Sequence, residues 1–322
     1  MVGGKTATGG LPPYTFPVYV GVDVSHTRLD VAVGDRVYEF PNPDGIPDIL
    51  ALLPPGSVVG MESTGVYGRP LALALHRAGF RVHVLNPVAV KAFARSLLRR
   101  AKTDKADARL IARFVAERQD DLTPYDPTPD TLYQVALLVR FARGLTVQRV
   151  AVLNRLHAWK YAWPEGLDLE VVASTPDCLQ ALRRGIEKVA LNLLRSDTLG
   201  WSWYQALQSL PGVGEVIALV IVAYSGDMRR FSSARAYAAY TGLTPRIYQS
   251  GDIPEMGSIS RMGPPALRSA YYLAALQARR VEPYASVYSR LLARGKARRL
   301  ALVAVANRLA RHAWAVCQGL TG

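Results

Sequence analysis

The order of strand-like and helix-like segments between residues 18 and 119 limits this chain to few folds. Short apolar runs follow one another at 18–24, 28–33 and 36–40, and Gly34-Asp35 is a typical hairpin turn. Helices and strands then alternate, with strands at 57–61 and 81–85 and helices at 48–53, 67–78, 88–99 and about 103–119. Hairpin strands followed by this alternation predict an α/β domain with a mixed sheet covered by helices.

The charge balance points to a polyanionic partner. The 322 residues include 39 Lys and Arg against 25 Asp and Glu, so the net charge is +14. Nucleic acid is the first partner to consider and an anionic membrane surface the second. No apolar run approaches the roughly 20 residues that span a bilayer. The N-terminus has no apolar signal core, and Cys178 and Cys317 are too far apart for a disulfide framework or zinc site, so we expect a reducing cytoplasm.

The remaining segments predict a helical second half. Residues 1–17, rich in Gly, Pro and Thr, are expected to be a flexible leader. After prolines at 124, 127 and 129, helical periodicity covers 130–163 and 176–210. Two long helices with a break between them predict an antiparallel hairpin or a dimerising arm, and simple packing helices are an equally common explanation. Residues 209–322 are expected to be mainly α-helical, with a polar loop at 242–252.

A Pro-Gly-Val-Gly turn at 211–214 precedes an apolar helix. It is similar to a helix-hairpin-helix turn, whose glycines let backbone N–H groups approach a phosphate. A purely structural turn is the commoner explanation for such a sequence.

Four acids stand at the ends of predicted elements. Asp23 lies near the end of the first strand, Glu62 follows the fourth, and Asp104 and Asp107 share one face of a helix. In the predicted topology the first and fourth strands can be neighbours, which would bring these carboxylates together. Four hard oxygen donors suit Mg²⁺ or Mn²⁺, and two such ions about 4 Å apart act on phosphodiesters. Each acid taken alone is more often a cap, a turn residue or a salt-bridge partner.

Basic residues accompany the acids and also crowd the C-terminus. Lys102, Lys105 and Arg109 flank the helical acid pair. Between residues 279 and 311 only Glu282 offsets a run of cations, which favours phosphate contact over a solvated face. The candidates from this run are Arg294, Lys296, Arg298 and Arg299.

In combination these segments resemble the DEDD-type transposases of bacterial and archaeal insertion sequences. The motifs that carry the resemblance are Val-Gly-Val-Asp-Val-Ser at 20–25, Met-Glu-Ser-Thr-Gly-Val-Tyr at 61–67, Val-Leu-Asn-Pro at 84–87, Lys-Thr-Asp-Lys-Ala-Asp-Ala-Arg at 102–109, Leu-Pro-Gly-Val-Gly at 210–214 and Tyr-Thr-Gly-Leu-Thr-Pro-Arg-Ile-Tyr-Gln-Ser-Gly at 240–251. The resemblance covers nearly the whole chain after the leader.

The resemblance implies a RuvC-like, RNase H-like domain over 18–123, a coiled-coil arm over 124–208 and a C-terminal transposase domain over 209–322. By position, the serine nucleophile of that domain is Ser250, and Arg246 beside it would hold the phosphate. The implied partners are donor and target DNA, a noncoding bridge RNA, and further copies of the chain in a dimer or tetramer whose subunits share active sites. The implied location is the bacterial or archaeal cytoplasm, at the nucleoid. Asp252 and Glu255 follow the serine, where family members often have basic residues.

Three other functions remain open. A hydrolytic nuclease or junction resolvase of RNase H type would need the acids and not Ser250. An actin-like sugar kinase or ATPase would share the opening motif, but the chain has no second glycine-rich phosphate motif downstream. A non-enzymatic nucleic-acid scaffold would use only the basic C-terminal run.

Overall fold

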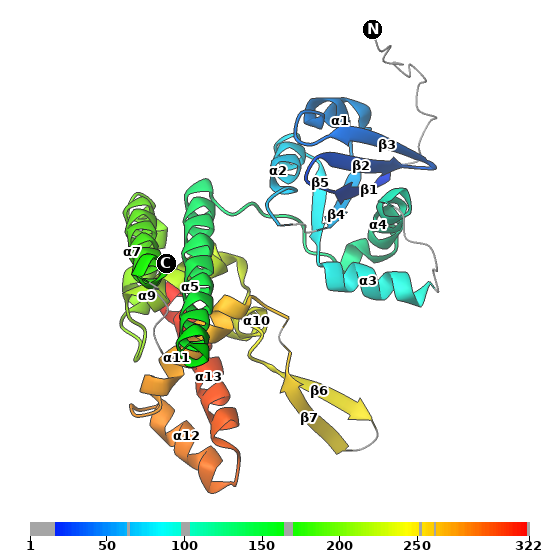
Figure 1. Cartoon of the computed structure of the whole chain (residues 1–322). Helices are drawn as coiled ribbons and strands as arrows, with labels where there is room; N and C mark the ends of the chain where they lie inside the picture. Colours follow the sequence, from blue (N-terminus) through cyan, green and yellow to red (C-terminus); the bar gives the residue numbers. More distant parts are fainter. Residues whose placement is uncertain are drawn as a thin grey trace. The chain divides into compact units, whose positions relative to one another are not determined.

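The computed structural model describes residues 17–62, 65–97, 104–163, 170–250, 253–260 and 262–320. The chain divides into two compact units, Met1–Pro127 and Thr128–Gly322, and each has its own hydrophobic core (Figure 1). All but the last residue of the expected leader lie outside the described residues. No helix in the described parts has the length and apolar content needed to cross a membrane.

The N-terminal unit is built on a five-stranded sheet in the order β3-β2-β1-β4-β5. Neighbours among the first three strands pair antiparallel, whereas β4 pairs in parallel with both β1 and β5. The sheet is therefore mixed, which confirms the prediction from the strand order. The strands are β1 (Tyr19–Val24), β2 (Arg28–Val33), β3 (Arg36–Pro41), β4 (Val58–Glu62) and β5 (Arg81–Leu85).

Helices cover both faces of this sheet. Strand residues alternate between the faces, so Val20 and Val22 pack on one side with Ile49 and Leu71. The helices on that side are α1 (Ile46–Leu52) and α2 (Arg69–Arg77). The other side carries α3 (Pro87–Ser96) and α4 (Asp104–Arg118), followed by the short 3₁₀ helix Gln119–Asp121.

The start of α3 follows directly from its sequence. The side chain of Asn86 caps the helix by accepting a hydrogen bond from the backbone N–H of Val88 at 2.9 Å. Pro87 occupies the first helical turn, where its missing N–H is not needed.

Two glycines let α4 lie directly on the sheet. Gly21 of β1 and Gly60 of β4 are register partners. A Cβ added at Gly21 would stand 2.0 Å from the carbonyl oxygen of Ala108 and 2.3 Å from the backbone nitrogen of Ala112. One added at Gly60 would stand 2.2 Å from Cγ2 of Val115. The helix therefore occupies the space that two side chains would otherwise fill.

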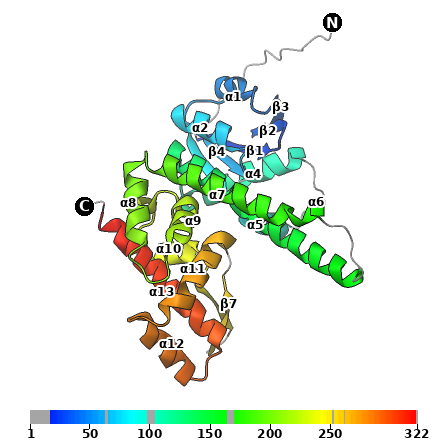
Figure 2. The same ribbon diagram turned by 60° about the vertical axis from the view of Figure 1, so that its left-hand side comes forward.

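The second unit is mainly helical. A helix of 33 residues, α5 (Asp130–Ala162), lies beside α7 (Thr175–Leu194), as both ribbon views show (Figures 1 and 2). The other elements are α6 (Glu170–Ala173), α8 (Thr198–Leu207), α9 (Glu215–Ser225), the 3₁₀ helix Met228–Arg230, α10 (Ala234–Tyr240), β6 (Pro245–Ser250), β7 (Ile253–Ile259), α11 (Pro265–Ala278), α12 (Tyr284–Ala293) and α13 (Arg298–Gln318).

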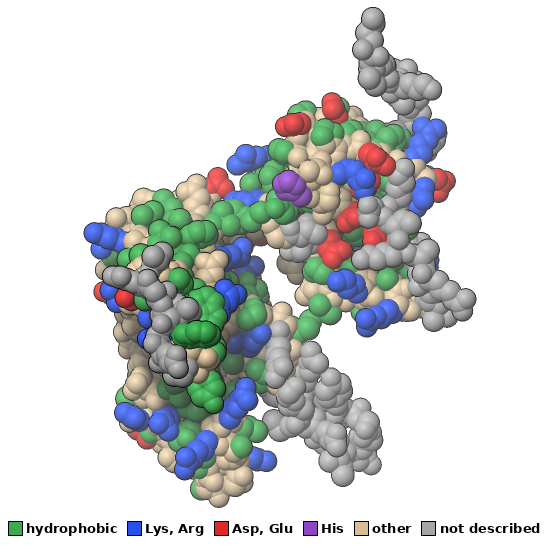
Figure 3. Space-filling view, viewed as in Figure 1, with side chains coloured by type: hydrophobic (Ala, Val, Ile, Leu, Met, Phe, Trp, Pro, Cys, Tyr) green, Lys and Arg blue, Asp and Glu red, His purple; other side chains and the backbone are tan. Residues whose placement is uncertain are grey.

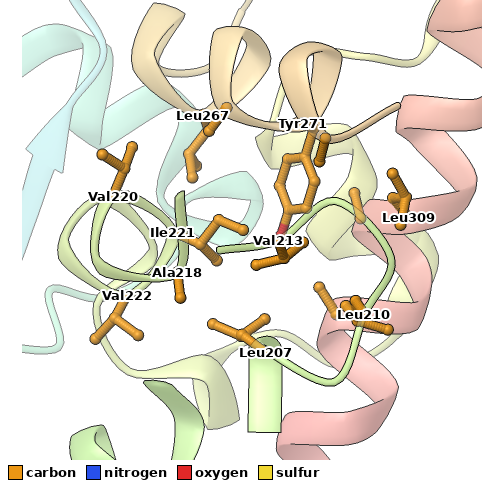
Figure 4. Packing of buried hydrophobic residues seen from close by; sticks show 14 of the residues in the cluster. Leu207, Leu210, Val213, Ala218, Val220, Ile221, Val222, Leu267, Tyr271 and Leu309 are labelled. Atoms are coloured by element: carbon orange, nitrogen blue, oxygen red, sulfur yellow. The ribbon is translucent and has the colours of Figure 1, made fainter. Parts of the chain in front are cut away.

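The core of this unit is centred on α9. Ala218, Ile221 and Val222 are fully buried, and Figure 4 shows them facing side chains of other elements, Tyr271 among them. The turn before α9 also belongs to this core: Gly212 has φ +79°, and an added Cβ would meet the carbonyl oxygen of Ala274 at 2.4 Å. Close packing against α11 therefore accounts for this glycine, in agreement with a structural role for the turn at 211–214.

Two segments differ from the sequence-based prediction. The expected helix at 176–210 is interrupted, because Asp197 accepts a hydrogen bond from the backbone N–H of Gly200 at 2.8 Å and starts α8 as a separate helix. The expected loop at 242–252 contains β6, which pairs antiparallel with β7. Backbone pairing with the next strand of the same hairpin stabilises β6, and the polar sequence at 242–252 does not indicate this pairing.

The glycine contact predicts a specific stability effect. Gly21→Ala should lower the free energy of unfolding by about 1–3 kcal/mol, because backbone atoms of α4 cannot move aside for a new Cβ. The matched control is Gly144→Ala on α5, where no atom lies within 4 Å of the added Cβ. It should stabilise the chain by about 0.5–1 kcal/mol. Urea unfolding of both variants measures this difference, and equal stability would contradict the close contact between β1 and α4.

Candidate functional site

Asp23 and Glu62 stand at the same edge of the sheet. β1 and β4 are parallel neighbours whose register pairs Val22 with Met61, so Asp23 and Glu62 are the next residues on their strands. Each lies two residues beyond a glycine that contacts α4, and therefore projects to the α4 face. Both side chains are half-buried. The structure thus brings together, by strand order and by face, two of the four predicted acids.

The other two acids lie in the first turn and a half of α4. Asp107 is half-buried and directly precedes Ala108, which is fully buried against Gly21. Asp104 begins the helix, and its side chain lies outside the described part of the structure. The contact with Gly21 therefore holds the segment carrying the acid pair on the same face as Asp23.

A fifth acid, which sequence analysis missed, lies opposite Asp23. Asp30 of β2 is the register partner of Asp23 and is only 2% exposed. Its Oδ2 accepts a hydrogen bond from Nε of Arg28 at 2.9 Å, while Oδ1 is buried and has no hydrogen-bond partner among the described residues. The register that pairs these two strands depends on the short turn between them, where the backbone N–H of Ser25 donates to the carbonyl of Arg28 at 2.9 Å, and sequence analysis found no signal for that register.

The carboxylates fit a hard divalent cation by their chemistry. Carboxylate oxygens are the donors that Mg²⁺ and Mn²⁺ prefer, and the buried, unpartnered Oδ1 of Asp30 is an oxygen that a cation or its hydration water would satisfy. Among the described side chains, no three from His, Cys, Asp and Glu already converge as a metal cluster. In Figure 3, acidic side chains gather on the N-terminal unit above α3.

The basic neighbours of the acid pair are described only in part. Lys102 and the side chain of Lys105 lie outside the described residues. Arg109 is exposed, and its Nη2 donates to the backbone carbonyl of Asp35 at 3.0 Å. One end of this guanidinium is thus fixed to the β2–β3 turn, which orients the remaining N–H groups.

Ser250 is the last residue of β6 and pairs with Ile253, the first residue of β7. Arg246 lies on the same strand, close to a shift in the register between Pro245 and Ile247. The side chains of both candidates lie outside the described set, so the structure gives their place on the backbone only. The serine belongs to the second unit, whereas the acids belong to the first.

The turn between α12 and α13 is a basic surface, which we call the basic tip. Every residue from Ala293 to Leu300 is exposed, and Gly295 turns the chain with φ +71°. The tip carries Arg294, Lys296, Arg298 and Arg299, and Figure 3 shows basic side chains gathered at this end of the unit. No acid occurs in the sequence after Glu282, so no neighbouring carboxylate along the chain neutralises them.

Comparisons with known proteins identify both units. Residues 20–159 match a family described as transposase, of the DEDD-type IS110 class, and residues 204–290 match the family described as transposase IS116/IS110/IS902.

Curated relatives agree with these matches. The chain is 28% identical over 262 residues to the pilin gene-inverting protein of Moraxella lacunata, covering 80% of this chain and 78% of the relative. It is 27% identical over 298 residues to the transposase of insertion sequence element IS1328 of Yersinia enterocolitica, covering 83% and 85%. A 65-residue stretch is 40% identical to the transposase of IS1111A of Coxiella burnetii, covering 20% and 18%. Residues 20–159 and 204–290 thus match transposase domains of the IS110 type, in this order along the chain, and the first match contains the mixed sheet.

Proposed function

We propose that this chain cuts and rejoins DNA as an insertion-sequence transposase, with Mg²⁺ or Mn²⁺ at the acids of the first unit and Ser250 as the nucleophile. The observation that carries the proposal is the position of Asp23 and Glu62 on neighbouring parallel strands, facing the helix that bears Asp104 and Asp107. The pilin gene-inverting relatives support recombination as the type of reaction, since their name describes a DNA inversion.

The acids have a definite task in this proposal. A bound divalent ion supplies Lewis-acid stabilisation of the charge that develops on a phosphodiester. Asp23 and Glu62 would hold it from the sheet, and Asp104 and Asp107 from α4. Because α4 is seated on the paired glycines, these oxygens are held on a rigid support, as catalysis by preorganised charge requires.

Ser250 would make the reaction reversible. Its Oγ attacks phosphorus and loses its proton, an O–P bond forms to the serine, and the bond from phosphorus to the 3′ oxygen breaks as that oxygen gains a proton. The phosphoserine keeps the energy of the phosphodiester for rejoining by another 3′-hydroxyl. Arg246 beside it would hold the phosphate. We further propose that the serine meets the acids between subunits of a dimer or tetramer.

We also propose phosphate contacts for the basic residues and a noncoding guide RNA as a partner. The exposed, acid-free basic tip supports the first, since uncompensated Lys and Arg bind phosphate backbones irrespective of sequence. Lys102, Lys105 and Arg109 would contact DNA near the acids. Guidance by RNA is supported by the family resemblance alone.

Loss of a helical acid should stop strand cleavage. We expect Asp107→Asn, and separately Asp104→Asn, to lower Mg²⁺-dependent cleavage of donor DNA on the order of 100-fold or more. The control is Asp121→Asn, which removes an exposed acid paired with Arg118 at 3.6 Å and should cleave normally. Gel assays of nicked product measure the rates. Normal cleavage by both helical variants would make the pair structural.

Loss of the serine hydroxyl should abolish the covalent step alone. In Ser250→Ala we expect no protein–DNA adduct on denaturing gels, while DNA binding stays at the wild-type level. Ser258→Ala, on the partner strand β7, is the matched control and should form the adduct. An adduct with Ser250→Ala would refute the assignment. Free 5′-phosphate ends without an adduct in the wild type would favour the hydrolytic nuclease.

Neutralising the basic tip should reduce the salt dependence of binding. With Arg294, Lys296, Arg298 and Arg299 all changed to Gln, affinity for duplex DNA should fall, and the slope of log K against log salt should shrink by up to about 0.9 per lost phosphate contact. Arg113→Gln, whose charge is paired with Glu117 at 2.6 Å, is the control and should retain the wild-type slope. An unchanged slope in the fourfold variant would exclude phosphate contacts by the basic tip.

Guidance by a noncoding RNA predicts that one defined RNA species co-purifies with the wild-type chain. Sequencing of that RNA tests this, and the same salt titration should be run on it.

A further inference from the structure

A row of carboxylates crosses the sheet of the N-terminal unit. Asp23 of β1 is the register partner of Asp30 of β2, which in turn is the register partner of Glu39 of β3. Register partners project to the same face, with Cβ atoms about 4.5–5.5 Å apart. Glu62 continues the row on β4, at the position next to Asp23. Acids directly opposite one another repel, so a row of this kind requires compensating positive charge.

Asp30 is the most deeply buried member of the row. It is 2% exposed, whereas Asp23 and Glu62 are half-buried and Glu39 is exposed. A buried carboxylate oxygen without a donor destabilises a fold, because it has lost its hydration and gained no hydrogen bond in exchange. Oδ1 of Asp30 is such an oxygen, and it belongs to a side chain that shares the face of Asp23.

Arg28 satisfies only part of this carboxylate. Its Nε contacts Oδ2 at 2.9 Å, and its side chain is 42% exposed. The pair therefore accounts for one of the two oxygens of Asp30. The remaining oxygen requires a donor that the described residues do not supply.

We propose that Asp30 is a positioning residue of the divalent-cation site. Oδ1 would accept a hydrogen bond from the hydration water of the cation, while Asp23 and Glu62 would supply oxygens to the cation directly. Mg²⁺ keeps several of its waters in protein sites, so an outer acceptor beside the ligands suits it. Arg28 contacts the carboxylate only through Oδ2, and the burial of Asp30 keeps Oδ1 in place without this ion pair. This inference rests on the proposed metal-assisted function.

Mn²⁺ binding to the full chain without DNA tests the proposal. We expect Asp30→Asn to bind Mn²⁺ about 10–100-fold more weakly in calorimetric or electron paramagnetic resonance titrations, as is usual when an outer acceptor is lost. Arg28→Gln should bind Mn²⁺ as well as the wild type or better, because it removes a positive charge and leaves Oδ1. Asp48→Asn, an exposed acid of α1 on the opposite side of the sheet, should have no effect.

The outcomes separate this inference from the proposed function. If Asp23→Asn loses Mn²⁺ binding but Asp30→Asn does not, Asp30 has no part in the site and the metal-assisted function stands. Equal weakening by Arg28→Gln and Asp30→Asn would make Asp30 an ordinary ion-pair partner. A wild type that binds no Mn²⁺ would overturn the metal function as well.

A second variant covers the risk that Asp30→Asn does not fold. The double variant Arg28→Gln/Asp30→Asn removes both charges of the ion pair, and its metal-free melting temperature reports whether the fold survives. It should bind Mn²⁺ about 10–100-fold more weakly than Arg28→Gln alone. Equal binding by these two variants would refute the role of Asp30.

Discussion

The close contact between α4 and the sheet is the constraint on which the rest of the N-terminal unit depends. Gly21 and Gly60 leave room for α4, and Ile111 and Val115 of this helix are fully buried against the sheet. A helix seated this near the strands brings Asp107 to the face of Asp23. A larger residue at either glycine would lift the helix and separate donors that belong to different elements. The fold and the candidate metal site thus rest on the same packing contact.

Local patterns were sufficient to predict the sheet and its helices. The hairpin at Gly34-Asp35 is a signal that a few neighbouring residues encode, and the structure confirms the mixed sheet predicted from it and from the order of strands and helices. The strand β6 escaped prediction because its stability comes from pairing with β7. The break at Asp197 was hidden in a long helical pattern, since a capping side chain is a weak signal beside the apolar periodicity around it.

The candidate metal site was predictable only in part, because strand order can be inferred from the sequence more readily than strand register. Strand order alone places Asp23 beside Glu62, whereas the pairing of Asp23 with Asp30 depends on the register of two antiparallel strands. The exposure of the basic tip follows from its charge, as expected for a short segment in which Lys and Arg predominate. The proposed meeting of Ser250 with the acids has no local signature at all, because it would join residues of separate units and, in our proposal, of separate subunits.

The ladder of β6 and β7 constrains the position of Ser250 through the phase of its strand. Residues of a strand alternate between two faces, so the phase at Ser250 depends on how many residues precede it in β6. Between Pro245 and Ile247 the ladder takes two steps along β6 and three along β7, so the extra residue lies on β7 and the alternation of β6 is unbroken. A one-residue deletion in β6 before Ser250 would shift the phase at that position while every helix of the unit kept its place. Insertions or deletions in β6 before Ser250 should therefore be tolerated only in steps of two residues, which keep the phase of the strand.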